Sequence, residues 1–394
     1  MSTTTSAANW DEVDLGDIVT LHRGYDLPSG KRRDGPIPIV SSSGITGYHD
    51  EAKISPPGVV TGRYGTLGEV FFVQEPFWPL NTTLYVSDFH GNDQRFVSYF
   101  LRCQGLGSRD GAAAVPGINR NVLHRLPARR PPLATQRKIA ATLSAYDDLI
   151  DNNNRRIKLL EEMFHRIHRE WLVDYRYPGR EKVPLVDSTL GPIPKGWEWM
   201  ELRQLAAESR LVVDPGSVAP TTPYVGLEHM PQRSIAIAEW GLAAQAGSQK
   251  YEFKAGDVLF GKIRPYFHKV AVSPVDGICS TDAIVIRSHS PKLSGLVLAV
   301  VSSDAFVEEA VQTSQGTKMP RANWNVLQRY PVALPPPVLI ESFGSYMDRT
   351  VAMIHRLVMS NRNLGATRDL LLPRLISGGI DVSDIEIAMP DAAA

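Results

Sequence analysis

The sequence has little cysteine and no apolar run long enough to cross a bilayer. Its 394 residues include two cysteines, Cys103 and Cys279, one in each half and without metal-ligand spacing. This pattern excludes a disulfide framework. The longest notable apolar stretch, residues 293–303, is too short to span a membrane, and residues 1–9 lack the charged and apolar regions of a signal peptide. We therefore expect a reducing, cytoplasmic environment.

The sequence also lacks a surplus of either charge. It has 42 Lys and Arg residues against 42 Asp and Glu residues, so its formal net charge is zero. A protein that binds nucleic acid without a partner protein usually has more basic than acidic residues. The balance therefore argues against strong binding of a polyanion by this chain alone, although local basic clusters are compatible with it. The hydrophobic fraction of 43% is ordinary for a protein with a sizeable core.

Signatures of catalysis are missing too. There is no GxxxxGK[ST] phosphate loop, no HExxH pattern, and no Asn or Asp before a Pro-Pro-aromatic stretch of the kind that holds a flipped adenine. The glycines of residues 62–68 do not have the spacing of a dinucleotide loop. His165 and His168 lie three residues apart on a predicted helix, where we expect a solvated face. The sequence therefore predicts no catalytic residue and no metal site.

What is present is an internal repeat. The segment NRNVLHRLP at 119–127 shares six of nine letters with NWNVLQRYP at 323–331, at an offset of 204 residues. The same offset relates flanking prolines: Pro116 to Pro320 and Pro131-Pro132 to Pro335-Pro336. Residues 10–15 resemble residues 197–202 at an offset of 187, but the segments between these markers align poorly. This pattern predicts one scaffold that carries two different domains.

Each half begins with a predicted globule of mixed α/β type, about 130 residues long. Strands are expected at 37–40, 58–61, 69–73 and 82–86, and then at 224–227, 258–263, 269–272 and 283–286. Helices are expected at 95–103 and 296–312. Residues 175–196 are rich in Pro and Gly and read as the linker between the halves.

A long helix is predicted after each globule. Residues 133–175 contain no Gly or Pro, and their apolar residues alternate in steps of four and three, which is typical of a coiled coil. Residues 340–371 repeat the register at an offset of 204, with Thr350 and Arg368 among the apolar positions and Gly365 inside. Pro373 is expected to kink or end this second helix.

Each helix carries one asparagine in its apolar seam, Asn153 and Asn361. A buried Asn at such a position weakens the pairing but specifies register. In an antiparallel pair, Asn153 opposite Asn361 brings residue 139 near 375 and residue 171 near 343. The alternative is that both asparagines lie at frayed or solvated positions.

Several motifs carry a family resemblance. They are PPLATQRKIA (131–140), LSAYDDLID (143–151), WLVDY (171–175), LGPIPKGW (190–197), QGTKMP (315–320), LLPRLISG (371–378), SSSGITGYH (41–49) and NTTLYV (81–86). Their order, together with the half-chain repeat, resembles the specificity (S) subunit of type I restriction–modification systems over nearly the whole chain.

This resemblance implies a non-catalytic subunit that reads an asymmetric, bipartite double-stranded DNA site. It implies that two methyltransferase subunits and restriction (translocase) subunits join it, and that S-adenosylmethionine, ATP and Mg belong to those partners.

The predicted fold is α+β, with two target recognition domains separated by two long antiparallel coiled-coil helices in a pseudo-twofold repeat. The predicted divisions are recognition domain 1 (1–130), first helix (131–175), linker (176–196), recognition domain 2 (197–334), second helix (335–378) and C-terminal tail (379–394).

Candidate DNA-binding residues lie in loops. Glycines flank Arg63, Tyr64 and Thr66, which lets the backbone approach DNA, and Arg paired with guanine is the commonest specific contact. The segment 261–266 stands in a comparable place in the second half. The remaining candidates are Lys262, Arg264, Tyr266, Lys318, Arg321 and Asn323, then Asn81 and Thr82, and, for phosphate contact, Lys31, Arg32 and Arg33. For each, an ordinary exposed polar loop is the alternative.

Two other functions remain open on the residues alone. One is a stand-alone protein that bridges DNA, and the other is a coiled-coil scaffold that binds no DNA. An unrecognised enzyme has the least support. Neighbouring genes for an adenine methyltransferase and a helicase-type nuclease would favour the specificity subunit.

Overall fold

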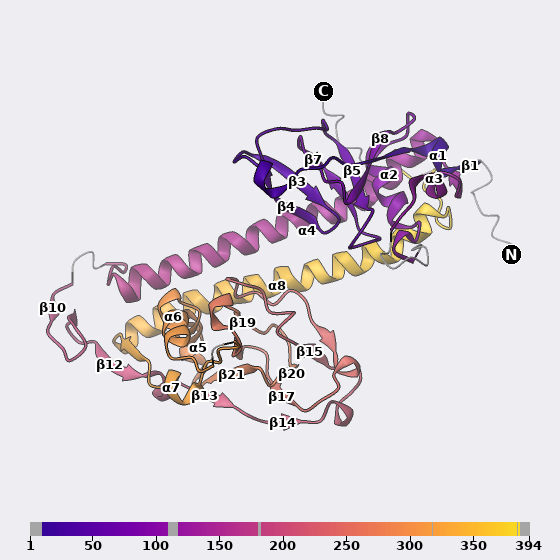
Figure 1. The fold of residues 1–394 in the computed structure, drawn as a ribbon. Coiled ribbons are helices and arrows are strands. Elements are labelled where there is room, and N and C mark those ends of the chain that lie inside the picture. The colour runs from indigo at the N-terminus through magenta and orange to yellow at the C-terminus, as the bar shows by residue number, and fades with distance from the viewer. Residues whose placement is uncertain (1–9, 109–116, 180–182, 317, 384, 387–394) are drawn as a thin grey trace. The chain divides into compact units, whose positions relative to one another are not determined.

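Figure 1 shows the computed structural model of the chain, which describes residues 10–108, 117–179, 183–316, 318–383 and 385–386. The chain divides into unit 1, residues 1–149 with 364–394, and unit 2, residues 150–363. Five predictions fall wholly or partly outside the described residues. They are the absence of a signal peptide (1–9), the repeat match at Pro116, and parts of the linker, the 315–320 motif and the C-terminal tail. Among the described residues, no helix is long and apolar enough to cross a membrane.

Unit 1 is built on a four-stranded antiparallel sheet with the strand order β2-β8-β5-β6. A three-stranded sheet, β4-β3-β7, and the pair β1-β9 accompany it. The strands are β1 (Asp11–Asp14), β2 (Thr20–Arg23), β3 (Ile37–Ser41), β4 (Gly44–His49), β5 (Gly58–Gly62), β6 (Val70–Val73), β7 (Trp78–Pro79), β8 (Thr83–Asp88) and β9 (Pro127–Arg130). The helices are α1 (Leu15–Ile18), α2 (Gln94–Arg102) and α3 (Arg120–Leu123), with parts of α4 (Leu133–His168) and α8 (Pro337–Ile376).

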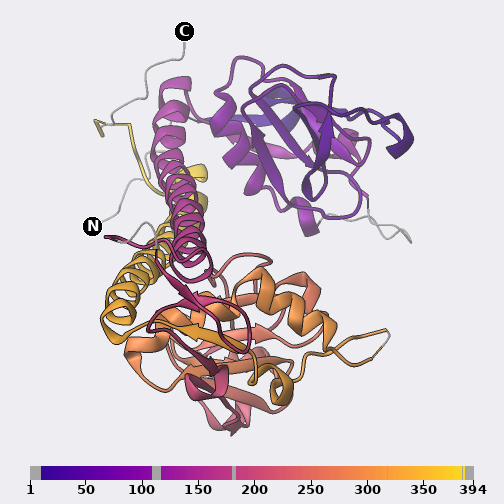
Figure 2. The ribbon, with the colours of Figure 1, turned by 90° about the vertical axis from the view of Figure 1, so that its left-hand side faces the viewer.

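Unit 2 has two larger sheets (Figure 2), with the orders β13-β21-β18-β19 and β14-β17-β20-β15-β16. The pairs β10-β11 and β12-β22 are separate. The strands are β10 (Leu185–Val186), β11 (Ile193–Pro194), β12 (Glu198–Glu201), β13 (Ala206–Ser209), β14 (Val212–Val213), β15 (Pro223–Val225), β16 (Gly241–Leu242), β17 (Lys250–Phe253), β18 (Val258–Gly261), β19 (Val270–Val272), β20 (Gly277–Cys279), β21 (Ala283–Ser288) and β22 (Pro331–Leu334). The helices are α5 (Ser294–Val301), α6 (Asp304–Gln312) and α7 (Trp324–Leu327), with the remaining parts of α4 and α8.

In each unit the repeated motif forms a capped short helix followed by a paired strand. In unit 1 the side chain of Asn119 caps α3 by accepting from Asn121 N at 3.0 Å, and β9 then pairs with β1. In unit 2 Asn323 caps α7 by accepting from Asn325 N at 3.0 Å, and β22 pairs with β12. Both halves carry this motif because, in each domain, the capped turn brings the following strand, β9 or β22, beside a strand near the start of the domain, β1 or β12.

Helices α4 and α8 run antiparallel, as predicted (Figure 1). In unit 1, Ile139 of α4 packs in one core with Leu375 of α8. In unit 2, the rings of Trp171 and Phe343 lie 5.8 Å apart. Asn153 Nδ2 donates to Asn361 Oδ1 at 2.8 Å, so the predicted pair is in contact. Every predicted seam position is buried or half-buried, because the alternating spacing keeps one face of each helix toward its partner.

The polar seam residues of α8 are satisfied locally. Arg368 Nη1 donates to Asp147 Oδ1 of α4 at 2.6 Å within unit 1. Thr350 Oγ1 donates to Tyr346 O at 3.0 Å, within its own helix. These bonds explain how two non-apolar residues fit in the seam.

The structure corrects three details of the helices. The predicted helix 296–312 is two helices, because Ser303 leaves the helical conformation and its Oγ accepts from Phe306 N at 3.2 Å to cap α6. Of the two outcomes expected at Pro373, a kink or an end, the end is wrong, because α8 continues one turn to Ile376. The end of α4 is not regular, since Arg169–Val173 forms a π-helical turn.

Candidate nucleic-acid interface

The loop after β5 in unit 1 is held in place by its backbone. Arg63 N donates to Thr82 O at 2.8 Å, and Ile118 N donates to Arg63 O at 3.0 Å. A Cβ at Gly62 would lie 1.9 Å from Thr66 O, so this close turn requires glycine. The loop therefore presents its side chains from a fixed position at the end of a central strand.

The Arg63 side chain lies in a groove of about 380 Å³. Its guanidinium stacks over the Tyr64 ring at 4.5 Å, and Nη2 donates to Tyr64 Oη at 3.3 Å. Arg23 and Arg120 line the same groove, together with Asn119 and Asn121 among others. Three guanidinium groups and two amide side chains match the groups that contact phosphates and base edges.

Arg23 and Arg120 are absent from the candidates drawn from the sequence. Arg120 had a usable signal, because it is the variable middle letter of the repeated Asn-x-Asn motif and corresponds to Trp324 in the second half. For Arg23 the sequence contains no such signal, since this residue ends a strand 40 positions before Arg63. Its guanidinium lies 3.4 Å from Asp26, so part of its charge is locally balanced.

The other unit 1 candidates lie apart from this groove or serve the fold. Thr66 and Lys31 are exposed. Asn81 donates to Asp26, and Thr82 supplies the carbonyl that anchors Arg63.

The basic run has mixed surroundings. Arg33 forms an ion pair with Asp50 at 2.6 Å, and this bond lowers the pKa of the Asp50 carboxyl. Arg32 is half-buried, and its Nε has no hydrogen-bond partner among the described residues. Of the run, Lys31 therefore has the most accessible charge for a phosphate.

The loop after β18 in unit 2 has the same anchor. Lys262 N donates to Asp282 O at 2.7 Å, and Ala322 N donates to Lys262 O at 2.9 Å. The antiparallel bridge Ile263–Arg321 corresponds to the bridge Tyr64–Gly117 in unit 1. Segment 261–266 thus occupies the place in its sheet that the Arg63 loop occupies in unit 1.

Most unit 2 candidates gather around this anchor. Arg264 N donates to Pro320 O at 2.8 Å, which brings the 318–321 segment beside the 262–266 loop. Tyr266 is 51% exposed, and Lys318 is exposed as well. Arg321 lies 3.6 Å from Asp282.

Two candidates also have local partners. Lys262 Nζ donates to Thr281 O at 2.9 Å. Asn323 is the cap of α7, and this structural role accounts for its appearance in the repeat.

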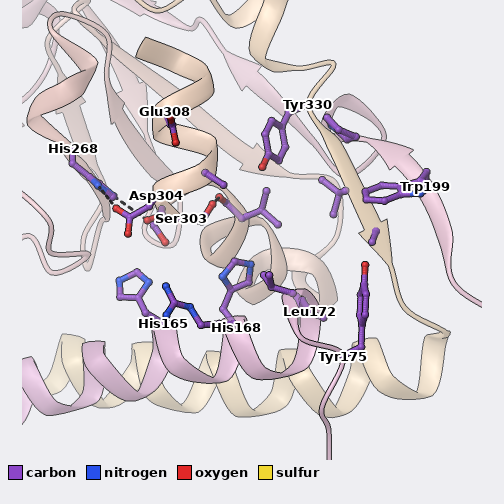
Figure 3. A pocket seen from close by; sticks show the side chains of 18 of the residues that line it. His165, His168, Leu172, Tyr175, Trp199, His268, Ser303, Asp304, Glu308 and Tyr330 are labelled. Atoms are coloured by element: carbon purple, nitrogen blue, oxygen red, sulfur yellow. Dashed lines mark hydrogen bonds and ion pairs between the residues drawn. The ribbon is translucent and has the colours of Figure 1, made fainter. Parts of the chain in front are cut away.

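Unit 2 also contains a cavity of about 640 Å³ (Figure 3). His165 and His168 project from α4 toward Ser303 and Asp304, so the expectation of a solvated face for these histidines is wrong. Burial lowers the pKa of His168 to about 4. The described residues include no group of three or more His, Cys, Asp or Glu side chains placed to hold a metal ion.

Comparisons with known proteins agree with this architecture. A family model described as "Type I restriction modification DNA specificity domain" matches residues 7–162. The chain is 22% identical to the type I restriction enzyme MjaIX specificity subunit of Methanocaldococcus jannaschii, over 96% of this chain and 95% of that protein. It is also 22% identical to the EcoDI specificity subunit of Escherichia coli, over 85% of this chain and 80% of that protein.

A solved structure shares the fold. The type I restriction–modification S subunit from M. genitalium superposes with a TM-score of 0.62 at 14% identity, over 97% of this chain and 99% of that chain. Both the sequence relatives and this fold point to one class, the proteins that give restriction–modification systems their DNA specificity. The chain is thus similar, over nearly its whole length, to the specificity (S) subunits of type I restriction–modification systems. In these systems the S subunit is the non-catalytic component that recognises DNA, while S-adenosylmethionine and ATP are bound by the modification and restriction subunits.

Proposed function

We propose that this chain reads an asymmetric, bipartite DNA site, with one recognition domain for each half. The observation that carries the proposal is the anchor that occurs twice, with Arg63 in unit 1 and Lys262 in unit 2 held by equivalent backbone bonds. Because the backbone bonds that hold these two loops are equivalent, they support the same DNA-reading role for both loops. The side chains around them differ, which supports two different half-site sequences.

The chemistry of the unit 1 groove supports DNA as the ligand. Arg63, Arg23 and Arg120 surround it, and Arg63 is stiffened by its stacking on Tyr64. An oriented guanidinium reads guanine O6 and N7 in the major groove, whereas the neighbouring guanidinium groups suit phosphates.

The partners follow from the family. We propose that two methyltransferase subunits dock on the pseudo-twofold body and that restriction (translocase) subunits join them in the cytoplasm. Methyl transfer to adenine and ATP-driven translocation then belong to the partners. Helices α4 and α8 would serve as the spacer between the two readers.

Domain exchange tests the two-reader arrangement. Residues 197–334 include both β12 and β22, which pair, so an exchange with the equivalent segment of a relative carries the paired ends together. We expect methylome sequencing to show that only one half-site changes, and that the reciprocal exchange of residues 1–130 changes only the other. A change in both halves from either exchange would contradict the proposal.

Deletion of the gene separates the alternatives. If the chain is a specificity subunit, its loss abolishes methylation of one bipartite motif in the host genome. A stand-alone DNA-bridging protein or a scaffold without DNA binding would leave the methylome unchanged.

A further inference from the structure

In unit 2, the segment 234–240 is held by side chains from both long helices. Glu161 of α4 accepts three hydrogen bonds through Oε1, from Ser234 Oγ at 2.6 Å, Ile235 N at 2.8 Å and Ala236 N at 3.1 Å. Hydrogen bonds to an ionised carboxylate are stronger than neutral ones. This single side chain therefore fixes both the position and the orientation of the start of the segment.

The end of the same segment is held from α8. The Arg362 guanidinium lies 3.7 Å from the centre of the Trp240 ring, and its Nη1 donates a long bond of 3.5 Å to Ala238 O. A cation over an indole face is the most favourable cation–π pair. We call Glu161 and Arg362, with the 234–240 segment between them, the 161/362 clamp.

The clamp is connected to the Lys262 loop through the sheet. Val272 N donates to Ile235 O at 2.9 Å, and Ala236 forms a parallel bridge with Val272, so the segment extends the sheet beside β19. Strand β19 pairs with β18, which ends at the Lys262 loop. A short, continuous path of main-chain and side-chain bonds therefore joins the helices to the loop.

The repeat does not contain a second copy of this clamp. The offset of 204 places Gly365 where Glu161 would be, and it places Lys158, which is exposed, where Arg362 would be. Glycine supplies no carboxylate. In unit 1 the helices hold their domain differently, through Asp147, which accepts from Tyr99 Oη at 2.5 Å and from Arg368 at 2.6 Å.

We propose that the 161/362 clamp is a positioning device that makes the protein selective for one gap length between its half-sites. The clamp holds the second recognition domain at one angle on its helices. The Lys262 loop therefore meets the DNA groove at only one distance, counted in base pairs, from the first half-site. The inference rests on the proposed function, because a gap exists only if two domains read two half-sites.

The test uses the complete complex of this chain with its methyltransferase. Three sets of duplexes carry the native half-sites with the native gap, one base pair less and one base pair more. The variants are Glu161→Gln and Arg362→Lys, each with a matched control on the same helix, Glu162→Gln and Arg356→Lys. Both control residues are exposed.

Each clamp variant loses one of the interactions that hold the segment 234–240. The preference for the native gap over the altered gaps should therefore fall by about tenfold in each variant. The half-site bases should not change, and the controls should keep the native preference. Arg362→Lys retains the charge but loses the planar stacking, so it remains informative if Glu161→Gln assembles poorly.

A uniform change at all three gaps would overturn the proposal, since it would show that the clamp supports only stability or assembly. An unchanged preference in both variants would overturn it as well. If the wild-type complex methylated no bipartite site at all, the proposed function itself would fail, and that result is visible before any variant is compared.

Discussion

Arg63 shows how one side chain gains a defined role from its surroundings. Its backbone is tied to Thr82 and Ile118, and its guanidinium stacks on Tyr64. The side chain therefore loses less freedom when it meets DNA than an unrestrained arginine would. Arg33, in contrast, is already paired with Asp50.

Replacing Arg63 should affect one base position. If Arg63 reads guanine, Arg63→Ala costs about 1–3 kcal/mol at that base pair and little elsewhere. Methylation rates of the complex on all single-base variants of the first half-site measure this. Arg33→Ala is the control, with a small effect that is equal for all sequences. An equal loss on every sequence for Arg63→Ala would make it a phosphate contact instead.

His168 makes the stability of unit 2 sensitive to acid. Its pKa of about 4 in the fold lies below the ordinary value of 6.5 in the unfolded chain. Between pH 6.5 and 4 the unfolded chain therefore binds more protons, and the stability decreases as the pH falls through this window. The contribution lost by pH 4 should be on the order of 3 kcal/mol.

Urea unfolding from pH 7.5 to 4.5 tests this expectation. His168→Gln should flatten the decline in stability between pH 6.5 and 4.5. His22→Gln, at an exposed position in unit 1, should leave the decline as it is in the wild type. Equal slopes for His168→Gln and the wild type would show that His168 does not titrate differently in the two states.

The two long helices act at the scale of elements. Their apolar seam is interrupted by the Asn153–Asn361 bond, and Asn361 Nδ2 also donates to Asn154 Oδ1 at 2.8 Å. A shifted register would leave these amides against apolar side chains, which costs free energy. We therefore propose that the pair specifies the register of the spacer, as a buried Asn does in coiled coils.

Lengthening both helices by one heptad tests the spacer. Seven residues inserted after Leu149 in α4 and after Asn363 in α8 fall at the division between the units. The added length is about 10 Å, or about three base-pair rises. The gap should therefore grow by a few base pairs, or recognition should be lost because DNA also turns, but the bases read in each half should stay the same.

Matched four-residue insertions are the control, because they shift the apolar seam and should impair the complex more. Methylome sequencing gives the gap directly. A seven-residue variant that methylated the original site with the original gap would refute the spacer role of the helices.

At the scale of the whole molecule, the charges balance. The 42 basic residues are matched by 42 acidic ones, although three arginines gather at one groove. Counterion release by phosphate contacts supplies most non-specific affinity for DNA. A neutral chain therefore suits a subunit that contributes selectivity while its partners contribute much of the electrostatic attraction.

The isolated chain should bind DNA weakly at physiological salt, with a Kd no tighter than about 1 μM. Adding the methyltransferase should tighten binding by at least about tenfold and steepen its dependence on salt, since more phosphates are neutralised. Fluorescence anisotropy with cognate and scrambled duplexes measures both quantities. Tight, sequence-specific binding by the chain alone would contradict this division of roles.

The sequence by itself determined the features that repeat along the chain. The heptad spacing, the half-chain offset and the Asn153–Asn361 pairing could be predicted, because they depend on residues a fixed number of positions apart on regular helices. The eight predicted strands all overlap observed strands, because their short β-type runs are bounded by turns, but others, such as β2, β4, β17 and β20, were not predicted. The break at Ser303 was missed although serine favours a helix N-cap over a helix interior, so the sequence did contain a signal for it.

Only the tertiary structure decided which distant residues meet. Arg23 and Arg120 join Arg63 because β2, β5 and the capped turn before α3 converge, and no spacing along the chain records that. His168 faces a cavity because one face of α4 packs against the second domain. The Glu161 contact has the same origin. The contacts of Arg23, His168 and Glu161 depend on segments whose sequences differ between the two halves, so the repeat could not predict them; Arg120, inside the repeated motif, is the exception.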